Sequence, residues 1–132
     1  MEALIIKKTD ETPAVIFNPE KGKFQIAGNA WPENAQKFFE KIFEWLEDYF
    51  IDPLDETVLE LRLNYFNTAV AKQLVKLLLL FKEKSEIHNV KIIWYYPKDD
   101  YATFMEAQRY KQLLDMGDIL EVKEIKTPNP TE

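Results

Sequence analysis

The sequence has 132 residues, of which 46% are hydrophobic and 14% aromatic, so the body of the chain is expected to fold around a core as one domain rather than stay disordered. It contains no cysteine, which excludes disulfides, thiol catalysis and thiolate metal sites. The formal net charge of −6, with lysines spread along the chain, argues against a nucleic acid or an anionic membrane surface as the partner.

The N-terminal third predicts strands. Residues 14–17 and 23–26 are rich in β-forming side chains and flank a turn that holds Pro19 and Gly22, which is the pattern of a hairpin. Residues 4–7 are expected to add an edge strand.

A long amphipathic helix follows the hairpin. Apolar residues recur at three- and four-residue steps from Ala35 to Phe50, which predicts one apolar stripe along the helix. Pro32 fits the first turn, where no backbone N–H is needed, and Asp52 with Pro53 is expected to end the helix.

Residues 57–66 alternate between apolar and polar side chains. Leu59, Leu61, Leu63 and Tyr65 are expected on one face, with charged or polar residues between them. This period of two predicts a strand with one buried face and one partly wet face.

The rest of the chain alternates helix and strand. The patterns predict a helix from about residue 67 to 84, a strand at 90–96, a helix capped at Asp99 or Asp100 and running to about Asp115, and a strand at 119–125. We therefore expect a single α/β domain, with a mixed β-sheet that starts with the hairpin, continues through βαβαβ crossovers and carries its helices mainly on one face.

The domain is expected to span residues 1–126, and the polar, proline-containing residues 127–132 are expected to form a flexible C-terminal tail. The first residues lack the pattern of a secretory signal, and the longest apolar run, residues 77–81, is too short to cross a bilayer. We expect a cytoplasmic protein.

No catalytic constellation is evident. His88 is the only histidine and lies in a polar loop, where no orienting partner or nucleophile can be named for it. The carboxylates fit solvated helix faces and loops, and no metal-ligand spacing is present. The sequence predicts no enzyme activity, no metal and no cofactor.

The segment 63–72 differs, because a strand turns directly into a helix there. Asn67 and Thr68 could each cap the helix, and the plain structural interpretation is that Thr68 is only an N-cap. The functional interpretation is that the Thr68 hydroxyl accepts a phosphate, which brings about 1.5 to 2 negative charges at pH 7. A helix N-terminus tolerates that charge, and Lys72 lies one turn further on, where it could pair with it.

Several stretches of this chain resemble the SiaC family of bacterial regulatory phosphoproteins, and together they cover almost its whole length. They are residues 12–17 and 22–28, 32–35, 38–39 and 45–46, 63–68 with Lys72, and 94–96. The specific blocks are Pro-Glu-Asn at 32–34 and Asn-Tyr-Phe-Asn-Thr at 64–68. Residues 101–116 resemble the family less well, which bears on the choice of partner.

The resemblance implies a fold similar to the STAS fold of anti-sigma-factor antagonists, with Thr68 at the position of the phosphoacceptor. It also implies a serine/threonine kinase of the histidine-kinase-type ATPase fold, and a PP2C-type phosphatase that reverses the modification. In some family systems the unmodified protein activates a diguanylate cyclase, which links it to cyclic di-GMP and biofilm signalling.

Three hypotheses follow. In the first, the chain is a non-catalytic binding protein switched by phosphorylation, with a docking face formed by Asn64, Tyr65, Asn67, Thr68 and Lys72. The sequence leaves open whether phosphate releases or recruits the partner.

The second hypothesis is a small-molecule enzyme with a pocket near Trp94, Tyr96 and Asp99. The third is an assembly protein that dimerises through its second helix, on which Val75 and Leu79 could form a contact surface.

Overall fold

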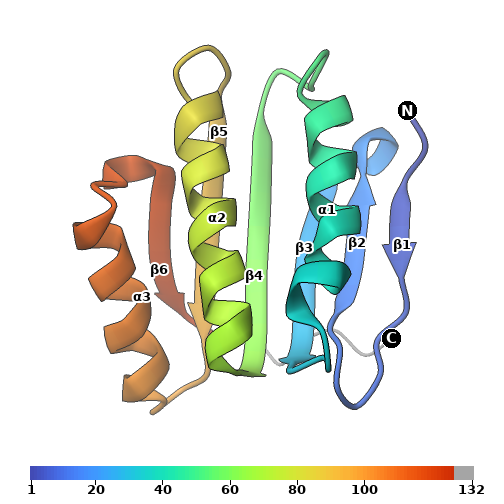
Figure 1. The fold of residues 1–132 in the computed structure, drawn as a ribbon. Helices are drawn as coiled ribbons and strands as arrows, with labels where there is room; N and C mark the ends of the chain where they lie inside the picture. The colour runs from blue at the N-terminus through green and yellow to red at the C-terminus, as the bar shows by residue number, and fades with distance from the viewer. Residues whose placement is uncertain (127–132) are drawn as a thin grey trace.

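Strands that follow one another in the chain also lie side by side in the sheet. The computed structural model describes residues 1–126 and shows six strands there in the order β1 to β6, so the predicted tail at 127–132 lies outside the described residues (Figure 1). Strands β1 (Leu4–Ile6), β2 (Ala14–Asn18) and β3 (Lys23–Ala30) pair antiparallel. The predicted hairpin and edge strand are confirmed.

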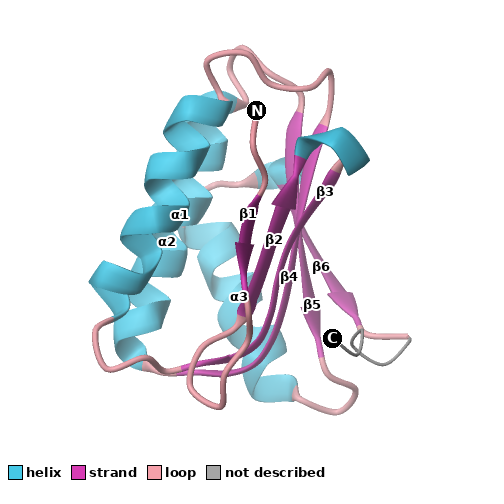
Figure 2. Cartoon of the chain, turned by 90° about the vertical axis from the view of Figure 1, so that its right-hand side faces the viewer, coloured by secondary structure: helices cyan, strands magenta, loops and turns pink. Residues whose placement is uncertain are grey.

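From β3 onward the sheet is parallel. Strand β3 pairs with β4 (Thr57–Phe66), which pairs with β5 (Val90–Tyr96), which pairs with β6 (Leu120–Glu124). The helices α1 (Ala35–Tyr49), α2 (Thr68–Lys84) and α3 (Tyr101–Leu113) connect these strands, and Figure 2 shows them on one face of the sheet. The predicted α/β architecture is therefore confirmed.

The predicted start of the first helix is wrong. The helix begins at Ala35, and Pro32 precedes it, because the side chain of Asn34 is the N-cap and accepts the N–H of Lys37 at 3.0 Å. It ends at Tyr49, before Asp52.

Two further boundaries differ slightly from the prediction. Asp100, not Asp99, caps α3, since Asp99 has a φ of 67° and lies outside the helix. The last strand begins at Leu120, because Ile119 belongs to the short 3-10 helix η2 (Gly117–Ile119).

Strand β4 forms the centre of the core. Leu59, Leu61 and Leu63 are fully buried, as the alternation predicted. Tyr65 breaks the pattern and is 57% exposed. The pairing of β4 with β5 ends at Leu61. The last residues of β4, among them Tyr65, therefore continue past their paired stretch of β5 toward the carboxyl end of the strands.

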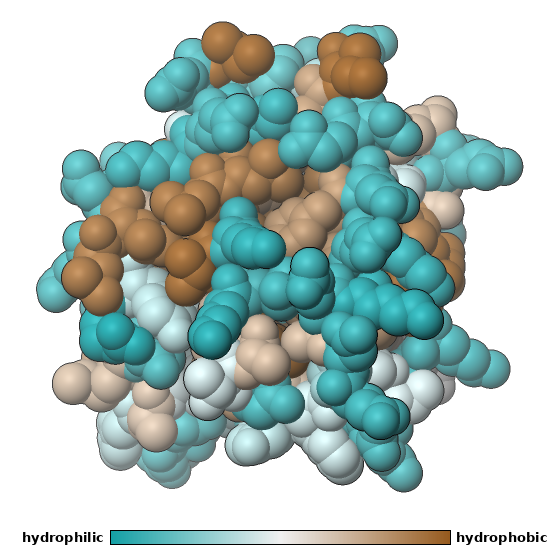
Figure 3. All heavy atoms as spheres, in the orientation of Figure 1, coloured by the Kyte–Doolittle hydropathy of each residue, from teal (hydrophilic) through white to brown (hydrophobic). Residues whose placement is uncertain are grey.

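Most of the broad apolar surface of α2 is core. Val70, Leu74, Leu77, Leu78 and Phe81 are all buried. On the outer side, brown apolar side chains form a patch bordered by hydrophilic ones (Figure 3), and Leu79, 45% exposed, is the exposed large hydrophobic residue of α2. The helix thus buries its apolar stripe within the domain.

None of the helices among residues 1–126 combines the length and the hydrophobicity that crossing a bilayer requires.

Leu78 and Leu79 offer a matched test of this packing, because they are adjacent leucines on one helix with opposite exposure. Leu78→Ala is expected to lower the free energy of unfolding by about 2–5 kcal/mol, through lost burial and a residual cavity. Leu79→Ala is expected to change it by less than about 1 kcal/mol. Urea denaturation followed by circular dichroism measures both values, and equal losses would contradict the arrangement.

Candidate functional site

The three helices begin at one edge of the sheet, where β3, β4 and β5 end (Figure 1). Each start is capped in the same way. Asn34, Asn67 and Asp100 accept the backbone N–H three residues further on, at 3.0, 2.9 and 3.1 Å. In open α/β sheets, binding sites lie outside the carboxyl ends of the strands, so this edge is the place to search.

Thr68 is the first residue of α2 and is exposed. The interpretation of Thr68 as the N-cap is wrong, because Asn67 has the extended backbone of a cap and its Oδ1 accepts the N–H of Val70. In the described part of the chain the Thr68 hydroxyl has no hydrogen-bond partner. It is therefore accessible and plays no part in holding the helix.

The other predicted docking residues precede and follow Thr68 in the chain. Asn64 and Tyr65 are exposed at the end of β4, and Lys72 is exposed one turn into α2. In residues 1–126, Lys72 forms no ion pair, so its ammonium group is available to an anion.

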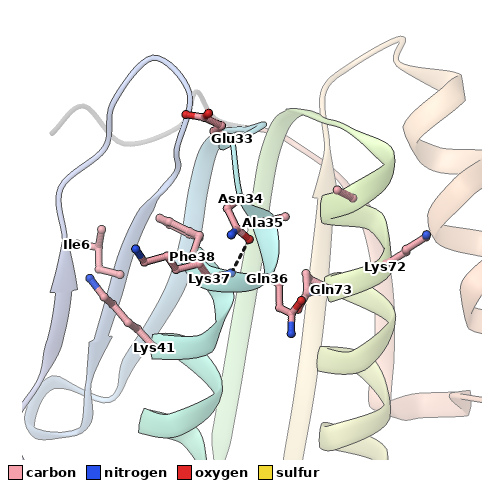
Figure 4. Close-up of a pocket in the computed structure, with 11 residues that line it drawn as sticks. Ile6, Glu33, Asn34, Ala35, Gln36, Lys37, Phe38, Lys41, Lys72 and Gln73 are labelled. Atoms are coloured by element: carbon pink, nitrogen blue, oxygen red, sulfur yellow. Dashed lines mark hydrogen bonds between the residues drawn. The ribbon is translucent and has the colours of Figure 1, made fainter.

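In the chain, Thr68 stands between residues that line two hollows, which the sequence did not predict. On one side, Asn64 and Tyr65 line a shallow hollow of about 310 Å³ with residues at the start of α3, among them Asp100 and Thr103. On the other side, Ala69 and Lys72 line an open groove of about 950 Å³ with the first turns of α1 (Figure 4). The N-cap residue that follows each parallel strand is the sequence feature that could have located both hollows.

The structure does not gather the residues of the enzyme hypothesis around a cavity. Trp94 is fully buried and packs on Phe66 and Tyr110, with ring centroids 5.8 and 6.2 Å away. Tyr96 packs on Phe104 at 5.1 Å. A side chain sealed in the core in this way cannot line a substrate pocket.

The histidine and the acidic side chains do not form a catalytic or metal site in the described part of the chain either. The ring of His88 stacks on Phe50, with centroids 6.1 Å apart. Among residues 1–126, no group of three or more histidine, aspartate or glutamate side chains is placed to hold a metal ion.

The chain is similar to known proteins along most of its length. The family model described as SiaC family regulatory phosphoprotein matches residues 6–122. A protein of Pseudomonas aeruginosa strain UCBPP-PA14, described as uncharacterized, is 27% identical over 113 residues, which cover 85% of this chain and 90% of that protein.

Solved structures show the same fold. SiaC of Pseudomonas aeruginosa is 25% identical, with a TM-score of 0.83 over 95% of this chain and 100% of that one. A chain in the crystal structure of the diguanylate cyclase SiaD in complex with its activator SiaC, also from Pseudomonas aeruginosa, is 25% identical. Its TM-score is 0.84 over 92% of this chain and 99% of that one.

Two neighbouring substitutions test which residue caps α2. Asn67→Ala is expected to lower the free energy of unfolding by about 0.5–2 kcal/mol, because the N–H of Val70 loses its acceptor. Thr68→Ala is expected to change it by no more than about 0.5 kcal/mol. Thermal and chemical denaturation of both variants provide the comparison. A larger loss for Thr68→Ala than for Asn67→Ala would mean that the threonine hydroxyl supports the helix.

Proposed function

Because the chain belongs to the SiaC family of regulatory phosphoproteins, we propose that it is a binding protein whose affinity for an effector is set by phosphorylation of Thr68. The observation that carries this proposal is the state of the Thr68 hydroxyl. It is exposed at the first position of α2 and is released from capping by Asn67.

The fold is expected to survive the modification. Helix geometry leaves the N–H groups of the first turn without intrahelical acceptors, and the helix dipole favours an anion there. Asn67 accepts only one of these N–H groups, that of Val70. Phosphate on Thr68 therefore adds charge at a place where the helix stabilises it, and the main change is on the surface.

The docking face consists of Asn64, Tyr65, Asn67, Thr68 and Lys72. Tyr65 is the anchor, since an exposed aromatic side chain contributes large contact area at low entropic cost. Phosphate in the middle of this face adds bulk and charge that must be desolvated when a partner binds. We therefore propose that phosphorylation releases the effector.

The partners follow from the family. SiaC of Pseudomonas aeruginosa is described as the activator of the diguanylate cyclase SiaD, and the two were crystallised together. By this likeness the effector of the present chain is a diguanylate cyclase. The resemblance of the phosphorylation segment supports a serine/threonine kinase of the histidine-kinase-type ATPase fold and a PP2C-type phosphatase as the opposing enzymes.

The switch is tested by binding of purified diguanylate cyclase to the unmodified and the enzymatically phosphorylated chain, measured by isothermal titration calorimetry. Phosphorylation is expected to weaken binding by about a hundredfold, a few kcal/mol, because the interface must desolvate the added charge. Thr68→Ala is expected to bind the cyclase and to resist release by the kinase.

Thr103→Ala is the matched control. Thr103 also lies in the first turn of a helix at this edge, but its hydroxyl is bonded to Oδ2 of Asp100 at 2.7 Å. This variant is expected to be phosphorylated and released like the unaltered chain. Mass spectrometry that finds the phosphate on a residue other than Thr68, or equal affinity of the two forms, would refute the switch.

A further inference from the structure

We infer that the groove between the first turns of α1 and α2 binds an acidic peptide segment of a protein partner. The inference deepens the proposed function and rests on it for the existence of such a partner. The groove has a volume of about 950 Å³ and includes residues of β1, α1 and α2.

Gln73 is the first observation that points to a ligand. It is only 8% exposed, lines the groove from α2, and has no hydrogen-bond partner among residues 1–126. Among the described residues, Trp94 Nε1 is the side-chain polar atom that is fully buried without a partner, so the amide of Gln73 reaches solvent in the groove. Its donors and acceptor are therefore accessible to a group that enters the groove.

A second amide comes from the opposite helix. Figure 4 shows Gln36 of α1 and Gln73 of α2 extending into the space between the two helices. Each primary amide offers both a donor and an acceptor, as does a peptide group. The pair is therefore suited to the N–H and C=O of an extended peptide backbone.

Positive charge collects in the same groove. Lys37 and Lys41 line it on the side of α1 that faces β1, and in the described part of the chain neither forms an ion pair. Lys72 also borders the groove, but its side chain extends away from α1 in Figure 4. Glu33 is the one acidic residue among the lining side chains. On a chain with a net charge of −6, this is a local site of opposite sign. It favours a ligand that carries carboxylates.

The lysines and the apolar side chains of the groove lie together. Lys37 and Lys41 are one helical turn apart and extend toward Ile6 of β1 in Figure 4. Ile6 and Phe38 are partly buried there and offer apolar contact. A peptide segment with alternating acidic and apolar residues matches this combination, and the open form of the groove admits a continuous chain.

The groove also adjoins the phosphorylation site. Ala69, which lines the groove, directly follows Thr68. A phosphate on Thr68 places negative charge beside the entrance, where it repels an acidic segment. Charge repulsion at the groove thus gives a physical reason for release on phosphorylation.

The test begins with panning a phage library of random dodecapeptides against the unmodified full chain. The selected peptides, synthesised with a fluorophore, are titrated by fluorescence anisotropy. Enrichment in aspartate and glutamate is expected. Gln73→Leu, which keeps the site filled, and the double substitution Lys37→Glu with Lys41→Glu are each expected to weaken binding by about tenfold or more.

Lys21→Glu with Lys23→Glu is the control pair. These two lysines are exposed, like Lys37 and Lys41, but lie at the β2–β3 turn and outside the groove. This variant is expected to bind the peptides as the unaltered chain does. Thermal melts confirm that each variant is folded. In ¹⁵N NMR spectra, the side-chain amide resonances of Gln36 and Gln73 are expected to move on peptide addition.

Selected peptides without acidic enrichment, or full affinity of the groove variants, would overturn the inference. The proposed function fails separately, if phosphorylation of Thr68 leaves binding of the cyclase unchanged while the peptides still occupy the groove. If phosphorylation releases the cyclase but the groove variants bind peptides normally, the switch stands and the groove is refuted.

Discussion

One hydrogen bond decides which residue caps α2 and which side chain stays free of that role. The N–H of Val70 donates to Oδ1 of Asn67 at 2.9 Å, which makes Asn67 the cap and leaves the next residue, Thr68, with a hydroxyl that supports nothing. A hydroxyl that held the helix could be phosphorylated only at the expense of the fold. With the cap supplied by its neighbour, Thr68 can change its charge while the strand-to-helix corner stays in place.

The proposed docking residues and the groove lie at one end of the sheet, where the strands end and the helices begin. Helices cover one face (Figure 2). The opposite face carries its own charge pairs, such as Lys91 with Glu121 at 2.6 Å. Hydrogen bonds from Lys91 and Lys123 lower the pKa of the Glu121 carboxyl, which keeps that network ionised. The unpaired lysines and the exposed tyrosine instead gather where the helices begin, so the rigid sheet presents them together.

The first turn of α2 joins the docking face and the groove. Thr68 belongs to the proposed docking face, and Ala69 and Gln73 line the groove, so in the proposed switch a single charge at this turn bears on both. Such a device requires no large conformational change, because a phosphate acts on a partner's charge over a few ångströms. In the proposed switch, only the surface potential changes.

By itself the sequence determined the elements and the acceptor candidate. Period-two alternation from Thr57 to Phe66 and the strand-to-helix break at Thr68 are local features, set by backbone geometry and side-chain spacing. The Asn67 cap is also a local contact, since the N–H that it accepts lies three residues further on, but the sequence left Asn67 and Thr68 as alternatives. Only the tertiary structure decided that Tyr65 is exposed and that Gln73 is buried. The exposure of Tyr65 depends on where the pairing of β4 with β5 ends, and the burial of Gln73 depends on how α1 packs beside α2. Both are contacts between distant parts of the chain, which no local pattern encodes.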